Sequence, residues 1–379
     1  GDQDGLFAST PPIEALRMIV HDAATVSKGI HQNIMINDVS RAFFEAECHR
    51  TVCIELPNED KTAQDRSDDN VGMLLKSLYG TRDAAANFQK EVSKFMRSIG
   101  FTVGKYNPST YYHPSRDIKT FVHGDDFVTS ASQENCQWLK GKLEGRFDIK
   151  TSILDPMKTG QEERILNRII RVTPHGWEIE ADQRHVDIVL RQLHIQKGVT
   201  SPAEDNPVAE EGDELKLPIA QASLYRQIAA RLNYLAQDRP DIQYATKEVC
   251  RGMSEPTGRD WKRIKRLGRY LLNNPRAVMH FEWQAPYFQI QSYSDSDFAG
   301  CRETAKSTSG GVIMIGSHLI KSYSATQKTV ALSSAEAELT AVVKCSCETI
   351  GITQLAYDWG LELACLLYTS DAADDCVCV

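Results

Sequence analysis

The sequence lacks the patterns that mark several classes of protein. It has no run of about 18 apolar residues, the least that a membrane-spanning helix needs, and its first residues lack the basic and apolar regions of a signal peptide. None of the ten cysteines forms a CxxC pair, which excludes a zinc ribbon and a thioredoxin-like site. We therefore expect a soluble, intracellular protein with reduced thiols and no membrane partner.

The composition is that of a folded protein. Apolar residues make up 41% and charged residues 25% of 379 residues, so wholesale disorder, collagen and coiled coil are excluded. This length predicts two or three domains. The net charge of -8 argues against a uniformly basic surface for nucleic acid and leaves room for local basic stripes.

Residues 200–218 differ in composition from the rest. They contain three prolines and six acidic residues against one lysine, Lys216, and too little apolar surface to fold. We predict an acidic linker between two domains here. Before it, short strands and helices alternate, with a strand over 32–39, a helix after residue 40, a helix over 83–100 and a hairpin that turns near Gly124. After it come a helix over 255–272, three strands between 287 and 325, and a long helix from Ser334.

Two groups of carboxylates are candidates for metal binding. Asp38 ends an apolar strand, and Asp125 and Asp126 lie at the hairpin turn, where Gly124 can adopt a positive φ. Three converging carboxylates bind divalent cations such as Mg²⁺, and two such ions can clamp the oxygens of a phosphoryl transfer. The alternative for each single residue is an exposed turn aspartate.

The second group lies near the C-terminal helix. Asp295 and Asp297 are two residues apart on a strand, and Ser333 with Glu336 forms a capping box that leaves Glu338 one turn into the helix. For Asp297 we favour an exposed structural residue, and for Glu338 a functional one.

The helix over 255–272 carries a basic stripe. At 100° per residue, four cations group on one side and four apolar residues on the other. A basic stripe suits a phosphate backbone, and a solvated helix face is the alternative. The stripe consists of Lys262, Lys265, Arg266 and Arg269.

Ordered motifs over residues 10–362 resemble the Pol polyprotein of copia-type retrotransposons. They are INDVSRAFFEA, VCIELP, LLKSLYGTRDAAANF, FVHGDDFV, YRQIAARLNYLAQDRPDI, YSDSDFAG and SSAEAEL. The resemblance implies an α+β fold, in which a reverse transcriptase palm and thumb-like region precedes an α/β ribonuclease H-like domain with a mixed sheet. The implied organisation is palm and thumb-like region at 1–199, linker at 200–218, connection region at 219–285 and incomplete ribonuclease H-like domain at 286–364.

The resemblance also implies the roles of individual residues. Mg²⁺ or Mn²⁺ would be held by two sets of catalytic carboxylates, Asp38, Asp125 and Asp126 for polymerisation and Asp295 and Glu338 for RNA hydrolysis. Phe43 matches an aromatic residue that blocks the 2′-hydroxyl of the incoming nucleotide, with a plain core phenylalanine as the alternative. Residues 76–88 match a segment that contacts template and nucleotide, which assigns nucleotide contacts to Tyr79, Gly80 and Arg82.

The chain departs from the family at several places. Asp83 replaces a family glutamine and is expected to repel phosphate, and His123 with Gly124 replaces a Tyr-Val pair, His123 as a structural substitute. Only 37 residues precede Asp38, so we expect most of the fingers to be missing and polymerisation to be inefficient. The third ribonuclease H carboxylate is also missing, because we regard Asp371 near its expected position as a coincidence.

Residues 365–379 form a separate problem. The string CLLYTSDAAD is what one reading frame of a common sequencing-library adapter encodes, so we expect an artefact tail. The alternative is an unusual natural tail.

The function implied by the resemblance is RNA-directed DNA polymerisation with ribonuclease H activity. The implied partners are an RNA template, a DNA primer, an RNA/DNA hybrid and deoxynucleoside triphosphates, with capsid, protease and integrase in the parent polyprotein. The implied location is the cytoplasm, within a virus-like particle, and the nucleus. The alternative is an inactive remnant that folds and binds nucleic acid without turnover.

Overall fold

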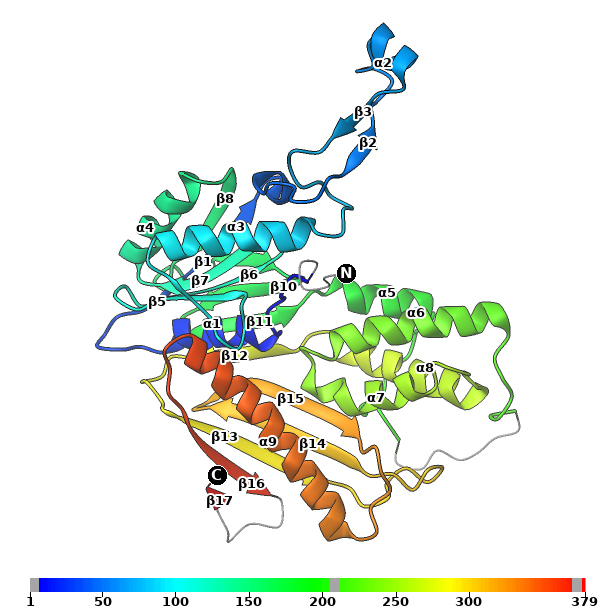
Figure 1. Ribbon diagram of the computed structural model, residues 1–379. Coiled ribbons are helices and arrows are strands. Elements are labelled where there is room, and N and C mark those ends of the chain that lie inside the picture. Colours follow the sequence, from blue (N-terminus) through cyan, green and yellow to red (C-terminus); the bar gives the residue numbers. More distant parts are fainter. Residues whose placement is uncertain (1–6, 205–211, 370–376, 379) are drawn as a thin grey trace. The chain divides into compact units, whose positions relative to one another are not determined.

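The computed structural model describes residues 7–204, 212–369 and 377–378, and their contacts divide into two compact units (Figure 1). Unit 1 contains residues 1–156 and 354–362, and unit 2 contains 157–353 and 363–379. No helix among the described residues has both the length and the apolar character to cross a membrane.

Unit 1 is built on a six-stranded antiparallel sheet in the order β4-β5-β6-β7-β1-β8. Its strands are β1 (Asn33–Val39), β4 (Thr102–Val103), β5 (Thr110–His113), β6 (Ile118–His123), β7 (Asp126–Ala131) and β8 (Ile149–Leu154). Helices α3 (Ala84–Ser98) and α4 (Gln133–Glu144) cover one face, and α1 (Glu14–Ala24) lies on the other (Figure 1). Since both faces are covered, strand β1 is buried at every position except Asp38.

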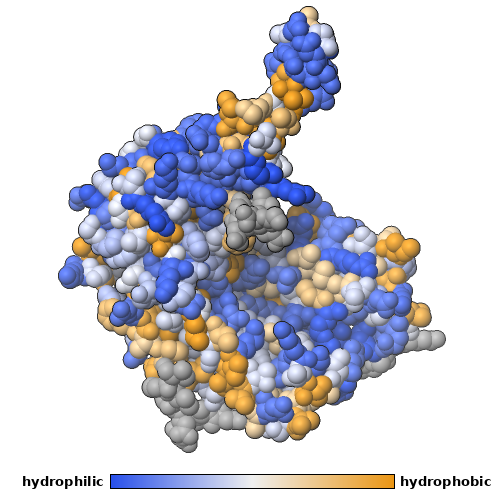
Figure 2. Space-filling model, viewed as in Figure 1, coloured by the Kyte–Doolittle hydropathy of each residue, from blue (hydrophilic) through white to orange (hydrophobic). Residues whose placement is uncertain are grey.

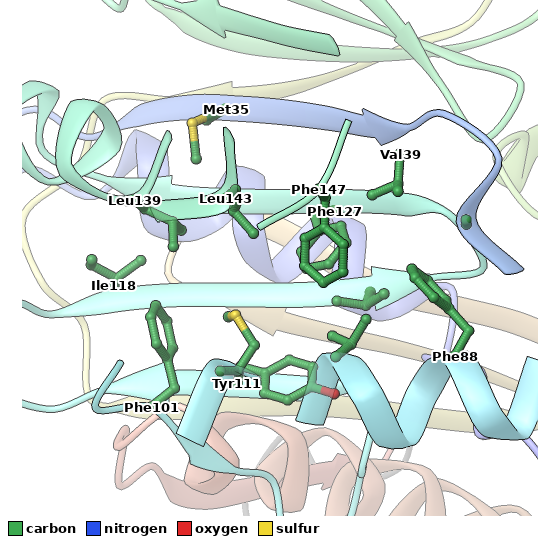
Figure 3. Packing of buried hydrophobic residues seen from close by; sticks show 14 of the residues in the cluster. Met35, Val39, Phe88, Phe101, Tyr111, Ile118, Phe127, Leu139, Leu143 and Phe147 are labelled. Atoms are coloured by element: carbon green, nitrogen blue, oxygen red, sulfur yellow. The ribbon is translucent and has the colours of Figure 1, made fainter. Parts of the chain in front are cut away.

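The core of unit 1 lies between the sheet and helices α3 and α4. Figure 3 shows Met35 and Val39 of β1 on the same side of the sheet as Phe127, Phe88 of α3 and Leu139 of α4. The period of two along β1 and of 3.6 along the helices brings these residues to a common face. This packing fixes the ends of β1 and β7, where the candidate carboxylates lie.

Unit 1 also carries a short two-stranded ribbon, β2 (Cys53–Glu55) with β3 (Val71–Met73), and helix α2 (Ala63–Asp68). Ile54, Val71, Met73 and Leu75 are exposed there. In Figure 2, the segment that contains the ribbon and α2 is hydrophobic (orange) at its base and hydrophilic (blue) towards its tip.

Unit 2 contains two sheets. Strands β9 (Glu162–Ile165), β10 (Arg168–Thr173), β11 (Gly176–Ala181) and β12 (Val278–Glu282) form an antiparallel sheet. The second sheet has the order β15-β14-β13-β16-β17, in which β13 pairs with β16 in parallel and the other pairs are antiparallel, so it is mixed as expected. Its strands are β13 (Gln289–Ser296), β14 (Thr308–Ile315), β15 (His318–Thr326), β16 (Ala364–Thr369) and β17 (Val377–Cys378).

The helices of unit 2 are α5 (Arg184–Gln192), α6 (Ile219–Leu235), α7 (Gln243–Arg251), α8 (Gly258–Asn273) and α9 (Ser334–Asp358). Ser292 and Thr349 join β13 to α9 through their hydroxyl oxygens, 2.6 Å apart. The last turn of α9 is assigned to unit 1, where the Asp358 carboxylate accepts backbone N–H bonds from residues 105–107 at 2.7–3.2 Å.

Two expectations differ from the structure. The helix expected after residue 40 is only a 3-10 turn, η2 (Ala42–Glu45), entered through Arg41 at φ 55°. The predicted boundary at 200–218 does not separate compact units, which divide between Pro156 and Met157. The physical reason is that α5, before the acidic segment, shares one core with α6, α7 and α8, which follow it.

Candidate active site

The first group of carboxylates comes together at the end of the unit 1 sheet. Asp38 lies directly opposite Asp126 in the antiparallel pair β1–β7. Asn37 and Val39 are buried while Asp38, near the end of the strand, is exposed. Asp38 therefore presents its carboxylate to solvent at the point where β7 begins.

The hairpin between β6 and β7 brings the third carboxylate to the same place. His123 pairs with Asp126, and Gly124 takes φ 65°, the left-handed region that glycine adopts freely. The backbone oxygen of Asp125 accepts a hydrogen bond from the Val39 N–H at 3.1 Å. The turn is thus bonded to the end of β1, so residues more than 80 positions apart in sequence are neighbours.

The pKa of Asp126 reflects how close the neighbouring carboxylates are. Burial, and then the negative charges of Asp125 and Asp38, raise the pKa of Asp126 to about 6. Carboxylate oxygens are the ligands that Mg²⁺ prefers, and a cation would relieve the repulsion among them. In the ranges that the structure covers, no three His, Cys, Asp or Glu side chains are gathered closely enough to hold a metal ion as they stand. The residue types and the mutual repulsion fit a divalent cation, and the side chains would have to close around it.

An aromatic cluster follows β1. The ring of Phe43, in η2, lies 4.4 Å from that of Tyr79 and 6.3 Å from that of Phe88 in α3, measured between ring centroids. Phe43 is partly buried against the core, and Tyr79 is 50% exposed. The structure brings together Phe43 and Tyr79, both predicted to contact the nucleotide. Gly80 follows with φ 92°, a conformation that favours glycine.

The expected repulsion of phosphate by Asp83 needs correction. The Asp83 side chain is 4% exposed and forms an ion pair with Arg50 at 2.6 Å. The hydrogen bond from Arg50 lowers the pKa of Asp83 to about 2, and Asn87 also donates to the carboxylate at 3.1 Å. The negative charge is therefore compensated and turned inward, whereas Arg82 next to it is exposed. Sequence reasoning missed Arg50, because a partner 33 residues away leaves no local pattern.

The second group of carboxylates lies in unit 2. Glu338, one turn into α9, accepts hydrogen bonds through Oε1 from the backbone N–H and the hydroxyl of Ser296, at 3.2 and 3.0 Å. Ser296 ends β13 directly after the exposed Asp295, so Glu338 lies at the end of the strand that carries Asp295. Glu338 Oε2 is buried and has no hydrogen-bond partner within the described chain, so this oxygen is available to a ligand.

Asp297 has a structural role instead. It lies just beyond β13 and accepts backbone N–H bonds from Thr308 at 2.6 Å and Gly300 at 3.4 Å. This agrees with the structural reading of Asp297, although it is not on the strand itself. Asp371 lies outside the described residues, as does most of the predicted artefact tail, whereas residues 365–369 belong to β16.

The basic stripe on α8 exists, with Ile264, Leu267 and Leu271 buried on the opposite face. Its members already have partners. Lys262 pairs with Asp213 at 2.6 Å, Arg266 pairs with Glu204, and Arg269 donates through Nε to the Lys197 carbonyl at 3.0 Å. Lys265 Nζ lies 5.7 Å from the ring centroid of Trp261.

Known proteins were compared with the chain as a whole. No protein-family model matches it. It is 28% identical over 338 residues to a retrovirus-related Pol polyprotein from transposon RE2 of Arabidopsis thaliana, covering 86% of this chain and 22% of that protein. It is 25% identical over 378 residues to the corresponding polyprotein from transposon TNT 1-94 of Nicotiana tabacum, covering 95% of this chain and 27% of that protein.

A solved structure of a foamy viral protease-reverse transcriptase in complex with double-stranded DNA aligns with 89% of this chain and 51% of that one. The TM-score is 0.25 and the identity 11%, a likeness too weak to bear on the fold. The chain spans about a quarter of the length of the two polyproteins, 22% and 27%. Over most of its length, this chain is a homologue of the retrovirus-related Pol polyproteins of copia-type plant transposons.

Proposed function

We propose that this chain is the part of a retroelement Pol polyprotein that performs RNA-directed DNA polymerisation and cleaves the RNA of an RNA/DNA hybrid. The observation that supports the proposal is that the backbone places Asp38, Asp125 and Asp126 side by side where β1 meets the β6–β7 hairpin. A polymerase needs carboxylates from separate strands at one point, because they must hold cations against the reacting phosphate.

In this proposal, Asp38, Asp125 and Asp126 hold Mg²⁺ or Mn²⁺, which when bound supplies positive charge to the attacking and leaving oxygens. Phe43, backed by Phe88 and in contact with Tyr79, forms a wall on which the sugar of the incoming nucleotide rests. A wall of this kind leaves no room for a 2′-hydroxyl, so it favours deoxynucleotides. Arg82 is exposed, and the charge of the neighbouring Asp83 is compensated by Arg50, so Arg82 can bind a phosphate.

For RNA cleavage, the proposed ligands are Asp295 and Glu338. Ser296 holds Glu338 Oε1, so the carboxylate keeps one orientation, and Oε2 is left for the cation. A second candidate function is a fragment that binds nucleic acid without turnover. It is favoured by the carboxylates of the described residues, which as they stand are not gathered closely enough to hold a metal ion.

The test is primer extension on an RNA template with deoxynucleotides and Mg²⁺. The wild-type chain is compared with Asp125→Asn/Asp126→Asn and with a control, Asp69→Asn, at an exposed turn where asparagine also tolerates the positive φ of 52°. We expect extension by the wild type and the control and none by the double variant. Equal extension by all three would contradict the polymerase assignment.

A second measurement does not require turnover. Mn²⁺ binding is followed by electron paramagnetic resonance in the same three proteins. We expect the double variant to lose the Mn²⁺ site of unit 1 and the control to retain it. Binding of Mn²⁺ with no extension would favour the second candidate function, and unchanged binding in the double variant would exclude these carboxylates as ligands.

A further inference from the structure

The acidic segment between α5 and α6 lies along helix α8 wherever the structure describes it. At the C-terminal end of α8, the Val199 N–H donates to the Arg269 carbonyl at 3.3 Å, and Asn273 donates to the Val199 carbonyl at 3.2 Å. At the N-terminal end, the N–H groups of Gly258 and Arg259 donate to the carbonyls of Leu215 and Asp213, at 3.0 and 2.9 Å. The two described ends of the segment are therefore bonded to opposite ends of one helix.

Three acidic side chains of this segment meet three cations of α8. Glu204 pairs with Arg266, Asp213 with Lys262 at 2.6 Å, and Glu214 with Arg259. Asp213 is 5% exposed and lies under this contact, whereas Glu204 and Glu214 remain exposed. We call Glu204, Asp213 and Glu214 the acidic strap.

We propose that the acidic strap occupies, in the free protein, the same cations that bind the phosphate backbone of a nucleic acid, so that the strap and the nucleic acid compete for α8. This inference rests on the proposed function, because it takes a nucleic acid as the partner. It adds an autoinhibitory contact between two segments of the chain.

The carboxylates of the strap and the phosphates of a nucleic acid differ in how strongly they bind the cations of α8. Glu204 and Glu214 are exposed, and ion pairs of exposed side chains contribute little to stability, so these two carboxylates can be displaced readily. The pair of the buried Asp213 with Lys262 is the part of the strap that resists displacement most. A duplex presents a regular row of phosphates, and each cation that binds one releases condensed counterions into solution. The isolated carboxylates of the strap have no condensed counterions to release. A nucleic acid therefore displaces them readily at low salt and less readily at high salt.

The spacing of the cations supports this partner. Arg259, Lys262 and Arg266 are three and four residues apart, so they lie along one side of the helix. Their side-chain exposures are 26%, 49% and 23%, so each is partly accessible to a ligand. Arg259 is also paired with Glu303 at 2.8 Å through its other terminal nitrogen, so release of Glu214 frees only part of its guanidinium. Lys265, exposed beside Trp261, extends the same basic surface.

The experiment measures binding of a fluorescent RNA/DNA hybrid by anisotropy across a series of salt concentrations. The strap variant is Glu204→Gln/Asp213→Asn/Glu214→Gln, which keeps the backbone bonds to α8 and the shape of each side chain. The control, Glu134→Gln/Glu144→Gln/Asp60→Asn, also removes three negative charges, from exposed positions of unit 1. Circular dichroism verifies that both variants are folded.

We expect the strap variant to bind the hybrid about 10-fold or more tightly at low salt than the charge-matched control. Its plot of log affinity against log salt should steepen by about 2 to 3, because each new phosphate contact adds about 0.7 to 0.9 to the slope. Adding Lys262→Gln/Arg266→Gln to the strap variant should remove the gain.

Other outcomes overturn the inference in distinguishable ways. If the wild type binds the hybrid and the strap variant binds no better than the control, the strap is a structural clamp and the proposed function stands. If neither protein binds the hybrid at any salt concentration, the strap inference fails, and the failure of binding itself counts against the proposed function.

Discussion

Asp126 shows how a single residue depends on its neighbours for its chemistry. Its pKa is raised to about 6 by burial and by Asp125 and Asp38, against about 3.9 in an unfolded chain. The folded state then binds a proton more tightly than the unfolded state between these two values. The favourable contribution of protonated Asp126 to stability is complete below about pH 4 and is lost as the pH rises through about 6.

The variant Asp126→Asn, which cannot ionise, should therefore be more stable than the wild type at pH 7.5, by about 1–2 kcal/mol after allowance for solvent screening of this half-buried group. At pH 4 the two should unfold alike. Thermal unfolding at both pH values measures the difference. Mg²⁺ should stabilise the wild type at pH 7.5 and have a smaller effect on the variant, and an equal effect on both would argue against a cation at Asp126.

Asp83 is the opposite case. The pKa of Asp83 is lowered to about 2, chiefly by its hydrogen bond with Arg50, so its stabilising contribution is present above about pH 4 and is lost as the pH falls through about 2. We expect Arg50→Ala to lower the unfolding temperature at pH 7 and to have almost no effect near pH 2. Arg50→Lys should restore part of the loss. A loss of the same size at both pH values would show that Arg50 acts through packing alone.

At the scale of an element, helix α1 is fastened to the sheet by a buried charge. Lys119 of β6 is 3% exposed and pairs with Asp22 of α1 at 3.0 Å and with Asp117 at 2.8 Å, and these carboxylates raise the pKa of Lys119 although burial lowers it. Ser130 of β7 donates to the same Asp22 at 2.6 Å. Lys119 and Ser130 therefore bond one oxygen each of the carboxylate that α1 brings to the sheet.

Removing the Lys119 side chain leaves the nearly buried Asp22 carboxylate without the cation that compensates its negative charge. We expect Lys119→Ala to lower the free energy of unfolding of unit 1 by about 3–5 kcal/mol. Urea denaturation followed by tryptophan fluorescence measures it. The control is Lys140→Ala, which breaks an exposed pair with Glu144 and should change stability by less than about 1 kcal/mol. Similar effects for both variants would show that Asp22 finds another partner.

Several elements could be predicted from the sequence because their signals are local. The apolar run of β1, the period of α3 that ends before Gly100, and the Gly124 turn each predict the observed element. The helix expected after residue 40 was wrong because Phe43 packs against Phe88 and Tyr79, and these tertiary contacts hold a single 3-10 turn. Periodicity alone does not reveal such contacts.

At the scale of the whole molecule, charge composition gave the wrong boundary. The boundary was inferred because residues 200–218 have few apolar side chains and many charges. Among the described residues of this segment, Glu204, Asp213 and Glu214 are instead paired with cations of α8. A composition argument considers a segment by itself, so it does not detect a partner that lies 50 residues away. The positions of Asp38, Asp125 and Asp126 in the fold were more predictable, because they lie at the end of a strand and at a turn.

The two proposed centres lie in different units and should be inactivated separately. We expect Asp125→Asn/Asp126→Asn to abolish primer extension and to leave hybrid cleavage unchanged. Asp295→Asn should lower hybrid cleavage and leave extension unchanged, and removal of Mg²⁺ with EDTA should stop both. A labelled primer and a labelled RNA strand in one reaction report both activities. Loss of both activities in either variant would show that the two centres depend on each other.

Strand β16 has a practical consequence for anyone who shortens this chain. It pairs with β13 over residues 364–369, five of which belong to the suspected adapter-derived tail. Trimming that tail would leave β13, which carries Asp295, as an open edge with unpaired N–H and C=O groups. Open edges recruit strands from other molecules, so a version that ends at residue 363 should self-associate at high concentration.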